Sequence, residues 1–183
     1  MAFMLTELFK TKERTKILRY VMYANTSTVA EVSRATGVNK GLVSRYLRYL
    51  EALKLLVRKN RKYSPTDEAP SRVVRLLINL ERIDLSTLSL DFAEGLGLYG
   101  SWAGGTNHLE SDLDVWIRVN SLPSESELAR LQRDLGRQVG AEVNLLVLTP
   151  EKLERLKQED TPFYDSLRMN SVTLAGEPLE KYR

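Results

Sequence analysis

Apolar residues recur at helical spacing through the first third of the chain. Residues 10–24 carry an amphipathic pattern that predicts a helix. Its apolar face consists of Ile17, Leu18, Val21 and Met22. Ser27 is the expected N-cap of a short second helix that ends at Gly37, and a third helix is expected from about Lys40 to Lys54. Two helices joined by a short turn that contains glycine are typical of a helix-turn-helix unit.

The segment "LLVRKNRKYS" follows these helices and predicts two short strands around a turn at Asn60. Pro65 and Pro70 are expected to end this hairpin and to begin a further helix, "SRVVRLLINLERI". A domain boundary is therefore expected here, with the new helix bridging the two parts. The predicted division is residues 1–66, residues 67–90 as a linker helix, and residues 91–183.

Short apolar runs in the second half predict strands. "LGLYGS" predicts a strand that runs into Gly100 and Ser101, and "DLDVWI" predicts a second strand that opens with Asp112 and Asp114. "AEVNLLVLTPEKLERL" predicts a further strand and helix, and "SVTLAGE" a terminal strand. This half therefore predicts a small mixed α/β domain.

Composition narrows the class of protein. The 183 residues include no cysteine, which excludes disulfides and cysteine metal sites. No apolar stretch approaches the ~20 residues that span a bilayer, and "MAFMLTELFKTKER" lacks a basic leader before a long apolar run. We therefore expect a cytoplasmic protein without a membrane partner.

The net charge of +3 conceals a strong asymmetry between the two halves. Residues 1–64 contain 14 Lys and Arg against 4 Asp and Glu, a net charge of +10, which leaves −7 for the remainder. Such a division indicates a polyanion-binding module joined to a module of another kind.

The basic residues fall on the outer side of the second helix of the helix-turn-helix and on the hairpin after it. With the polar Asn39 and Ser44, the candidate DNA-binding residues are Asn39, Lys40, Ser44, Arg45 and Arg48 on the helix, and Arg58, Lys59, Arg61 and Lys62 at the hairpin. Residues 10–66 resemble the winged-helix family of bacterial and archaeal transcription regulators. The resemblance implies that the helix reads base edges of double-stranded DNA, that the wing contacts phosphates, and that the protein forms a homodimer. A solvated helical bundle and a protein-binding winged helix are the alternatives.

The glycines at 95, 97 and 100 spell the dinucleotide-binding signature G-x-G-x-x-G. That signature needs a strand before its first glycine and a helix opening within the glycine run. Here the glycines lie inside the expected strand, so we reject dinucleotide binding. "GSWAGGT" also fails as a P-loop, because Thr106 stands where the lysine should be.

A different combination of residues predicts a phosphate and metal site. Alternate residues of a strand share a face, so Asp112 and Asp114 can direct both carboxylates at one point. Magnesium prefers such oxygen ligands and completes its shell with substrate phosphates. Gly100 lets a phosphate approach the backbone, and Ser101 adds a hydroxyl at the start of a short helix. The pattern predicts a site for a metal-bound nucleoside triphosphate.

The stretch "LYGSWAGGTNHLESDLDVWI", residues 98–117, resembles the nucleotidyltransferase superfamily, which includes DNA polymerase beta and kanamycin nucleotidyltransferase. It is most similar to the minimal, single-domain members. The resemblance implies an α+β chain, a winged helix-turn-helix joined to a nucleotidyltransferase-fold domain. It also implies magnesium or manganese, and transfer of a nucleoside monophosphate to an acceptor. Some minimal members in toxin–antitoxin pairs transfer AMP to a partner's tyrosine, so the acceptor can be a protein.

Two departures from the family pattern bear on catalysis. Gly104 stands where the minimal members have a basic residue, although Arg118 or a partner chain could supply that charge. The third carboxylate of the family aligns with Asn144, with Glu142 two residues earlier on the same face. Asn144 is thus the third candidate catalytic position beside Asp112 and Asp114. Alternatives to an active enzyme are a nucleotide-sensing transcription regulator, signalling through the helix near residues 70–84, and an antitoxin-like protein that modifies or masks a partner.

Three other side chains offer weaker candidates. His108, the single histidine, lies in the loop before the aspartates and is expected to be solvated. Trp102 could stack on a nucleobase, whereas Trp116, inside an apolar strand, is expected in the core.

Overall fold

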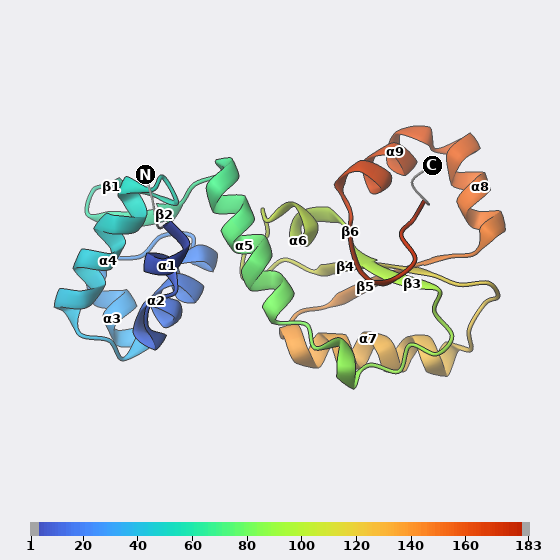
Figure 1. The fold of residues 1–183 in the computed structure, drawn as a ribbon, viewed down its shortest axis with the longest axis horizontal. Coiled ribbons are helices and arrows are strands. Elements are labelled where there is room, and N and C mark those ends of the chain that lie inside the picture. The colour runs from blue at the N-terminus through green and yellow to red at the C-terminus, as the bar shows by residue number, and fades with distance from the viewer. Residues whose placement is uncertain (1–3, 181–183) are drawn as a thin grey trace. The chain divides into compact units, whose positions relative to one another are not determined.

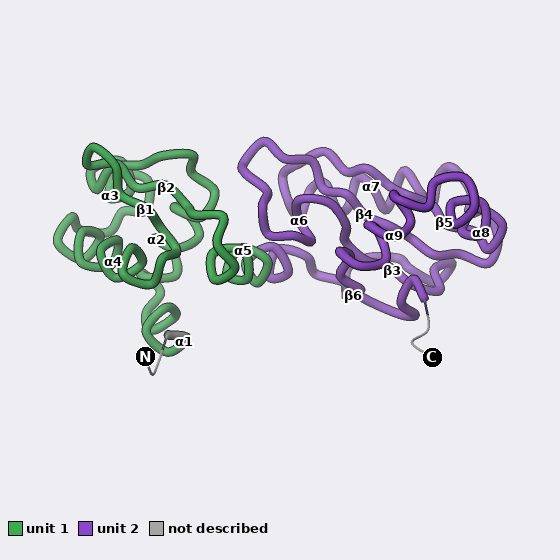
Figure 2. The backbone as a smooth tube through the Cα atoms, turned by 90° about the horizontal axis from the view of Figure 1, so that it is seen from above, with its two compact units in different colours: residues 1–78 green, residues 79–183 purple. Residues whose placement is uncertain are grey.

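The computed structural model describes residues 4–180 and divides the chain into two compact units, residues 1–78 and 79–183 (Figures 1 and 2). Each unit has its own buried apolar core. The expected α+β class is confirmed, with helices and a two-stranded sheet in unit 1 and a four-stranded mixed sheet in unit 2.

Unit 1 has the order of elements of a winged helix. Its elements are α1 (Met4–Leu8), α2 (Lys12–Tyr23), α3 (Val29–Thr36), α4 (Lys40–Ala52), β1 (Leu56–Lys59), β2 (Lys62–Pro65) and α5 (Ala69–Glu81), the last of which extends past Ile78 into unit 2. The apolar face predicted for α2 is buried, as are Val43, Tyr46, Leu47 and Leu50 of α4. Gly37 ends α3 in the left-handed conformation, with φ at 71°.

The N-cap of α3 is Thr28, so the expectation that Ser27 caps this helix is wrong. The Thr28 hydroxyl accepts from the Glu31 backbone N–H, and the Glu31 carboxylate accepts from the Thr28 N–H at 2.7 Å. Ser27 instead forms a β-bridge with Tyr63 of β2, with both backbone hydrogen bonds at 2.8 Å. This pairing requires Ser27 to be extended and joins the start of the helix-turn-helix to the wing.

The wing turns at Asn60, as expected. Asn60 and Arg61 have φ values of 50° and 64°, which is the geometry of a type I′ hairpin turn. β1 and β2 pair antiparallel, with Lys59 opposite Lys62.

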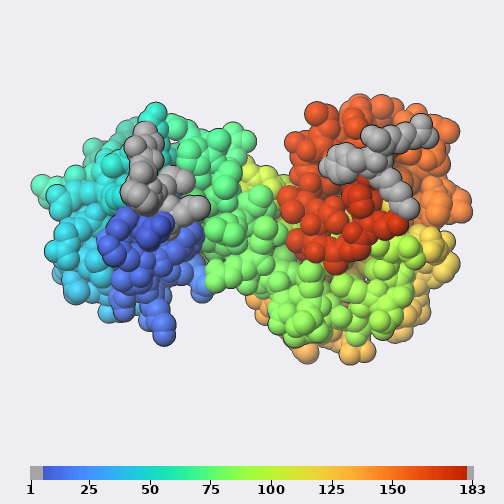
Figure 3. Space-filling model, in the orientation of Figure 1, coloured from blue at the N-terminus to red at the C-terminus, as the bar shows by residue number. Residues whose placement is uncertain are grey.

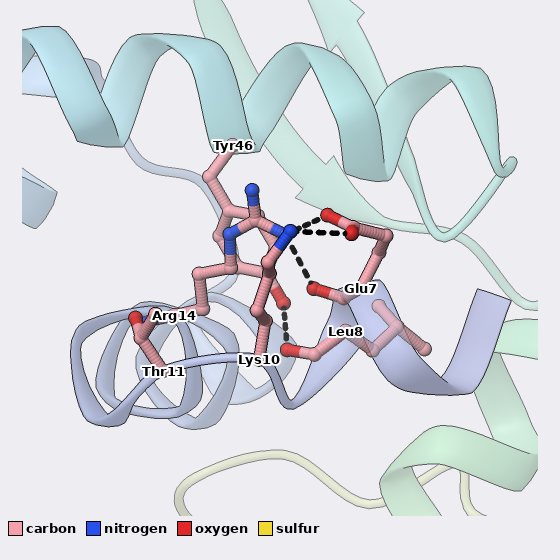
Figure 4. A network of polar contacts seen from close by, with 6 residues as sticks. All are labelled: Glu7, Leu8, Lys10, Thr11, Arg14 and Tyr46. Atoms are coloured by element: carbon pink, nitrogen blue, oxygen red, sulfur yellow. Dashed lines mark hydrogen bonds and ion pairs between the residues drawn. The ribbon is translucent and has the colours of Figure 1, made fainter. Parts of the chain in front are cut away.

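A polar network joins α1 to α2 and α4 (Figure 4). Arg14 donates to the Glu7 backbone oxygen at 2.6 Å and to the Glu7 carboxylate, and Lys10 donates to the same carboxylate at 2.8 Å. The Tyr46 hydroxyl donates to the Leu8 carbonyl at 2.7 Å, and the Arg14 guanidinium lies 5.3 Å from the Tyr46 ring. Burial raises the pKa of Tyr46, so this hydroxyl stays a donor.

Unit 2 is built on a mixed sheet with the strand order β5-β4-β3-β6. β3 pairs antiparallel with β4 and β6, and β4 pairs parallel with β5. Its elements after α5 are η1 (Leu85–Thr87), β3 (Gly95–Leu98), α6 (Gly100–Gly104), β4 (Leu113–Arg118), α7 (Glu125–Val139), β5 (Val143–Leu148), α8 (Pro150–Glu159), α9 (Thr161–Asn170) and β6 (Val172–Gly176).

Helices cover both faces of this sheet (Figure 1). α7 packs on the face that carries Leu96, Val115 and Ile117, and α8 and α9 pack on the face that carries Trp116. β6 lies at one edge of the sheet, at the surface beside the segment that precedes β3 (Figure 3). The carbonyl of Glu94 in that segment accepts from the Glu177 N–H, just after β6, at 2.8 Å.

α5 and the segment after it contribute apolar side chains to buried cores. Val74 and Ile78 pack in the core of unit 1. Several residues of 79–90 pack against the core of unit 2, namely Leu80, Ile83, Leu85, Leu88 and Leu90. Within residues 4–180, no helix is long and apolar enough to cross a membrane.

Candidate functional site

Gly100 and Asp114 are brought together by the antiparallel pairing of β3 and β4. Leu98 pairs with Val115, and the Tyr99 N–H donates to the Asp114 carbonyl at 3.1 Å, which places Gly100 against the Asp114 side chain. A Cβ on Gly100 would lie 2.4 Å from Asp114 Oδ2. Gly100 also has φ at 65°, where only glycine is free of strain. Only glycine fits between this turn and the carboxylate.

Asn144, the residue at the third-carboxylate position of the family pattern, lies beside Asp114. The parallel pairing of β4 and β5 places these residues opposite each other, and Asn144 Nδ2 donates to Asp114 Oδ1 at 3.1 Å. A carboxylate at this position would repel Asp114 in the absence of a cation, whereas the amide donates to it. Asn144 therefore holds one oxygen of Asp114 while the other faces Gly100.

Asp112 and Glu142 precede the two strands. Both side chains are exposed, and the Glu142 carbonyl accepts from the Leu113 N–H at 2.8 Å. Asp112 comes two residues before Asp114, at the mouth of the same strand. The described part of the chain has no group of three or more His, Cys, Asp or Glu side chains that could hold a metal ion.

The residue types at this strand end would suit one divalent cation better than two. Two carboxylates would provide oxygen ligands for magnesium or manganese, and phosphate oxygens and water would complete the shell. A second ion would need a further anionic oxygen, and the amide of Asn144 directs an N–H at Asp114 instead.

Ser101 follows Gly100 in α6 and is half-buried. Its carbonyl accepts from the Thr106 N–H at 2.9 Å, which closes the turn after this short helix. Trp102, the next residue, is 1% exposed and packs in the core, so the expectation that it could stack on a base is wrong. Trp116 is buried, as expected, and a Cβ on Gly97 would lie 2.4 Å from its ring.

Arg118 lies too far from the site to replace the basic residue that the minimal members have at the position of Gly104. It ends β4 four residues after Asp114, roughly 13 Å away at ~3.3 Å per residue. Its guanidinium donates to the Pro178 carbonyl at 2.9 Å and lies 3.4 Å from the Glu177 carboxylate. There it lines a separate cavity of about 790 Å³ between α8, α9 and β6, together with Lys157.

Tyr99 lies next to the Gly100–Asp114 contact and packs edge-on against Phe163 at 6.4 Å. Burial, and secondly the negative charge of Asp114, raise the pKa of Tyr99 above its usual value. The phenol is therefore protonated at neutral pH.

The loop from Gly105 to Asp112 has neither helix nor strand, but hydrogen bonds fix it. His108 Nδ1 lies 2.7 Å from the Ser111 hydroxyl, and the Trp102 indole N–H donates to the Ser111 carbonyl at 3.3 Å. Two buried asparagines, Asn79 and Asn107, complete this arrangement. Neither asparagine is among the site residues predicted from the sequence, although the polar Asn79 inside the run "VVRLLINLERI" indicates a buried amide.

Four of the nine predicted DNA-binding residues line one cavity of unit 1. They are Ser44 and Arg48 of α4 and Arg58 and Arg61 of the wing, and the cavity of about 600 Å³ is also lined by Thr28. The remaining candidates lie at exposed positions of the same elements, namely Asn39, Lys40, Arg45, Lys59 and Lys62. The Asn39 side-chain oxygen is the N-cap of α4, accepting from the Leu42 N–H at 2.9 Å, so it is not free to read a base.

Comparisons with known proteins agree with this description. Residues 13–62 match the MarR family, and residues 84–169 match the Nucleotidyltransferase domain family. Both resemblances seen in the sequence are thereby confirmed. No curated protein matches the chain.

Two solved structures are similar over part of the chain. One is described as "Crystal structure of the toxin-antitoxin with AMP-PNP"; it is 18% identical, covers 60% of this chain and 75% of its own, and gives a TM-score of 0.36. The other is a mutant of the toxin-antitoxin MntA-HpeT, with 14% identity, coverage of 60% and 74%, and a TM-score of 0.35. On the family matches and the observed elements, this chain combines a MarR-type winged-helix domain with a nucleotidyltransferase domain.

Proposed function

We propose that this protein binds double-stranded DNA through α4 and the wing and holds a metal-bound nucleoside triphosphate in its second unit. One observation carries the nucleotide part: Gly100 leaves no space between its backbone and the Asp114 carboxylate, 2.4 Å from where a Cβ would lie. Because Gly100 has no side chain, phosphate oxygens could approach the backbone of this turn. The Asp114 carboxylate beside it could then bind a cation that also contacts those oxygens. The basic cavity between α4 and the wing supports the DNA part.

The nucleotidyltransferase match supports transfer of a nucleoside monophosphate to an acceptor. An acceptor hydroxyl oxygen would attack the α-phosphorus, and the bond between that phosphorus and the oxygen bridging to the β-phosphate would break. Pyrophosphate leaves with the bonding electron pair, and the hydroxyl proton passes to solvent. A divalent cation held by Asp112 and Asp114 would supply positive charge to the phosphate oxygens. A protein hydroxyl, in an antitoxin-like role, is one candidate acceptor.

A second candidate function is nucleotide sensing without turnover. Asn144 favours it, because its amide donates to Asp114 at 3.1 Å and cannot accept a proton from an attacking hydroxyl. The protein would then be a transcription regulator whose DNA affinity depends on bound nucleotide.

Nucleotide labelled separately at the α- and γ-phosphates distinguishes these functions. ATP and CTP, each with magnesium, are incubated with the full chain and with cell extract as a source of acceptors. Label transferred from the α- but not the γ-position supports the transferase. Binding of both labels without transfer supports the sensor, and no binding of either nucleotide contradicts both. The homodimer expected from the winged-helix resemblance stays a prediction, which light scattering checks.

A further inference from the structure

We propose that Asn79 and Asn107 are positioning residues of the nucleotide site. Their paired amides would hold the loop that connects the turn at Gly100 and Ser101 to Asp112. The inference rests on the nucleotide binding proposed above and adds two residues that contact neither phosphate nor metal.

The two side chains form a closed hydrogen-bonded pair inside unit 2. Asn79 Nδ2 donates to Asn107 Oδ1 at 2.9 Å, and Asn107 Nδ2 donates back to Asn79 Oδ1 at 3.1 Å. Asn79 Nδ2 also donates to the Trp102 carbonyl at 2.8 Å. Asn79 is 0% exposed and Asn107 1% exposed.

These bonds reach both halves of the loop. The Trp102 carbonyl belongs to α6, which begins at Gly100, and Asn107 lies midway between Ser101 and Asp112. The Trp102 indole in turn donates to the carbonyl of Ser111, the residue before Asp112. The asparagine pair therefore connects the phosphate turn to the start of the aspartate strand.

A buried amide pair is a directional restraint rather than a large source of stability. The net contribution of one such hydrogen bond is only about 1 kcal/mol, and an apolar pair of similar shape could fill the space. Removing one amide, however, takes hydrogen bonds away from buried polar atoms of the other, and this loss favours a shift of the loop. The loop also has hydrogen bonds of its own around His108 and Ser111, but it is the asparagine pair that connects it to α5.

The decisive variant is Asn107→Asp, studied as a function of pH. Its carboxylate could still accept from Asn79 but could not donate to Asn79 Oδ1, and burial would raise its pKa well above the usual value of about 4. Below that raised pKa the protonated carboxyl donates again, and the pair is restored. The site should therefore be impaired at high pH and recover at low pH.

We measure the dissociation constant of a fluorescent ATP analogue with magnesium between about pH 5 and pH 8, where a raised carboxyl pKa would fall. Affinity is expressed as the ratio of variant to wild type at each pH, because the nucleotide itself titrates. The dissociation constant of Asn107→Asp should be at least about ten times that of wild type at pH 8 and should approach the wild-type value at pH 5. Asn107→Ala should be unfavourable at every pH, and Asn170→Asp, the same change at an exposed position, should match wild type.

Hydrogen–deuterium exchange over residues 99–112 gives a readout that needs no nucleotide. Exchange there should accelerate in Asn107→Ala and, at high pH alone, in Asn107→Asp. Wild-type affinity and exchange in both variants would overturn the positioning role. If the wild type binds no nucleotide, the proposed function is wrong and the positioning role is wrong with it. If the wild type binds nucleotide and the variants bind it equally well, only the positioning role is wrong.

Discussion

Gly100 and Asp114 are in such close contact that a Cβ on Gly100 would lie 2.4 Å from Asp114 Oδ2 and 3.3 Å from its Cγ. The glycine also has a positive φ, so a side chain there is opposed both by the backbone and by the carboxylate. This contact joins the end of β3 to the beginning of β4 and defines the candidate phosphate site.

Gly100→Ala should weaken nucleotide binding by at least about tenfold, which corresponds to ~1.4 kcal/mol. The methyl group would displace Asp114 or the turn, and isothermal titration with ATP and magnesium measures the loss. Gly104→Ala is the matched control, because a Cβ there meets only Thr106 Oγ1 at 3.7 Å. Equal affinities for the two variants would mean that the Gly100 turn is not the phosphate site.

Asn144→Asp should increase the number of manganese ions bound per chain from one to two when a non-hydrolysable triphosphate is present. The added carboxylate would supply the anionic oxygen that the amide does not. Electron paramagnetic resonance counts free and bound manganese, and pyrophosphate release, if any, should rise in the same variant. Wild-type protein that already binds two ions would contradict this account of Asn144.

DNA affinity should fall steeply with salt, because phosphate contacts release counterions. Arg48→Ala and Arg58→Ala should each reduce the slope of log K against log salt by about one, as expected for loss of one phosphate contact. Fluorescence anisotropy with duplex DNA gives this slope. Lys16→Ala removes the same charge from α2, outside the cavity between α4 and the wing, and should leave the slope near that of wild type.

Thr28→Ala should destabilise the protein by about 1 kcal/mol, the typical cost of losing an N-cap. Ser27→Ala should cost less, because the Ser27 hydroxyl is buried without a hydrogen-bond partner in the structure. Urea denaturation of the two variants compares them directly. A larger loss for Ser27→Ala would contradict the capping role of Thr28.

The capping contact also predicts a pH dependence. The backbone N–H of Thr28, and next its hydroxyl, lower the pKa of the Glu31 carboxyl. A lowered folded-state pKa means that this stabilisation is present above the ordinary glutamate pKa and is lost as pH falls through the folded-state value. The difference in stability between wild type and Glu31→Gln should therefore shrink in acid.

Local patterns predict most of the elements near the two sites. The winged helix is predicted by three local features: Gly37 at the end of one helix, the helical spacing of Val43 and Leu47, and the turn at Asn60. Each feature depends only on residues close to it in the sequence. Gly-Ser followed by Asp112 and Asp114 likewise predicts the ends of β3 and β4. α7 is not among the predicted elements, although Ser124 and Glu127 form a capping box at its start and a parallel β4–β5 pair requires a crossover.

Pairings between distant residues could not be predicted in the same way. The bridge of Ser27 to Tyr63 decides which of two adjacent hydroxyl residues caps α3. The partner of Asn79 lies 28 residues away, and nothing in the local sequence identifies it. Arg118 shares a strand with Asp114, yet its distance along that strand removes it from the site.

Titration of the full chain with ATP and magnesium, for wild type and Asp114→Asn, tests the central claim most directly. The account predicts magnesium-dependent binding by the wild type and at least about a hundredfold weaker binding by the variant, since a ~3 kcal/mol loss is typical when a charged ligand group is neutralised. Glu110→Gln, an exposed change in the adjoining loop, should bind as the wild type does. Undiminished, magnesium-dependent binding by Asp114→Asn would show that the nucleotide is held elsewhere.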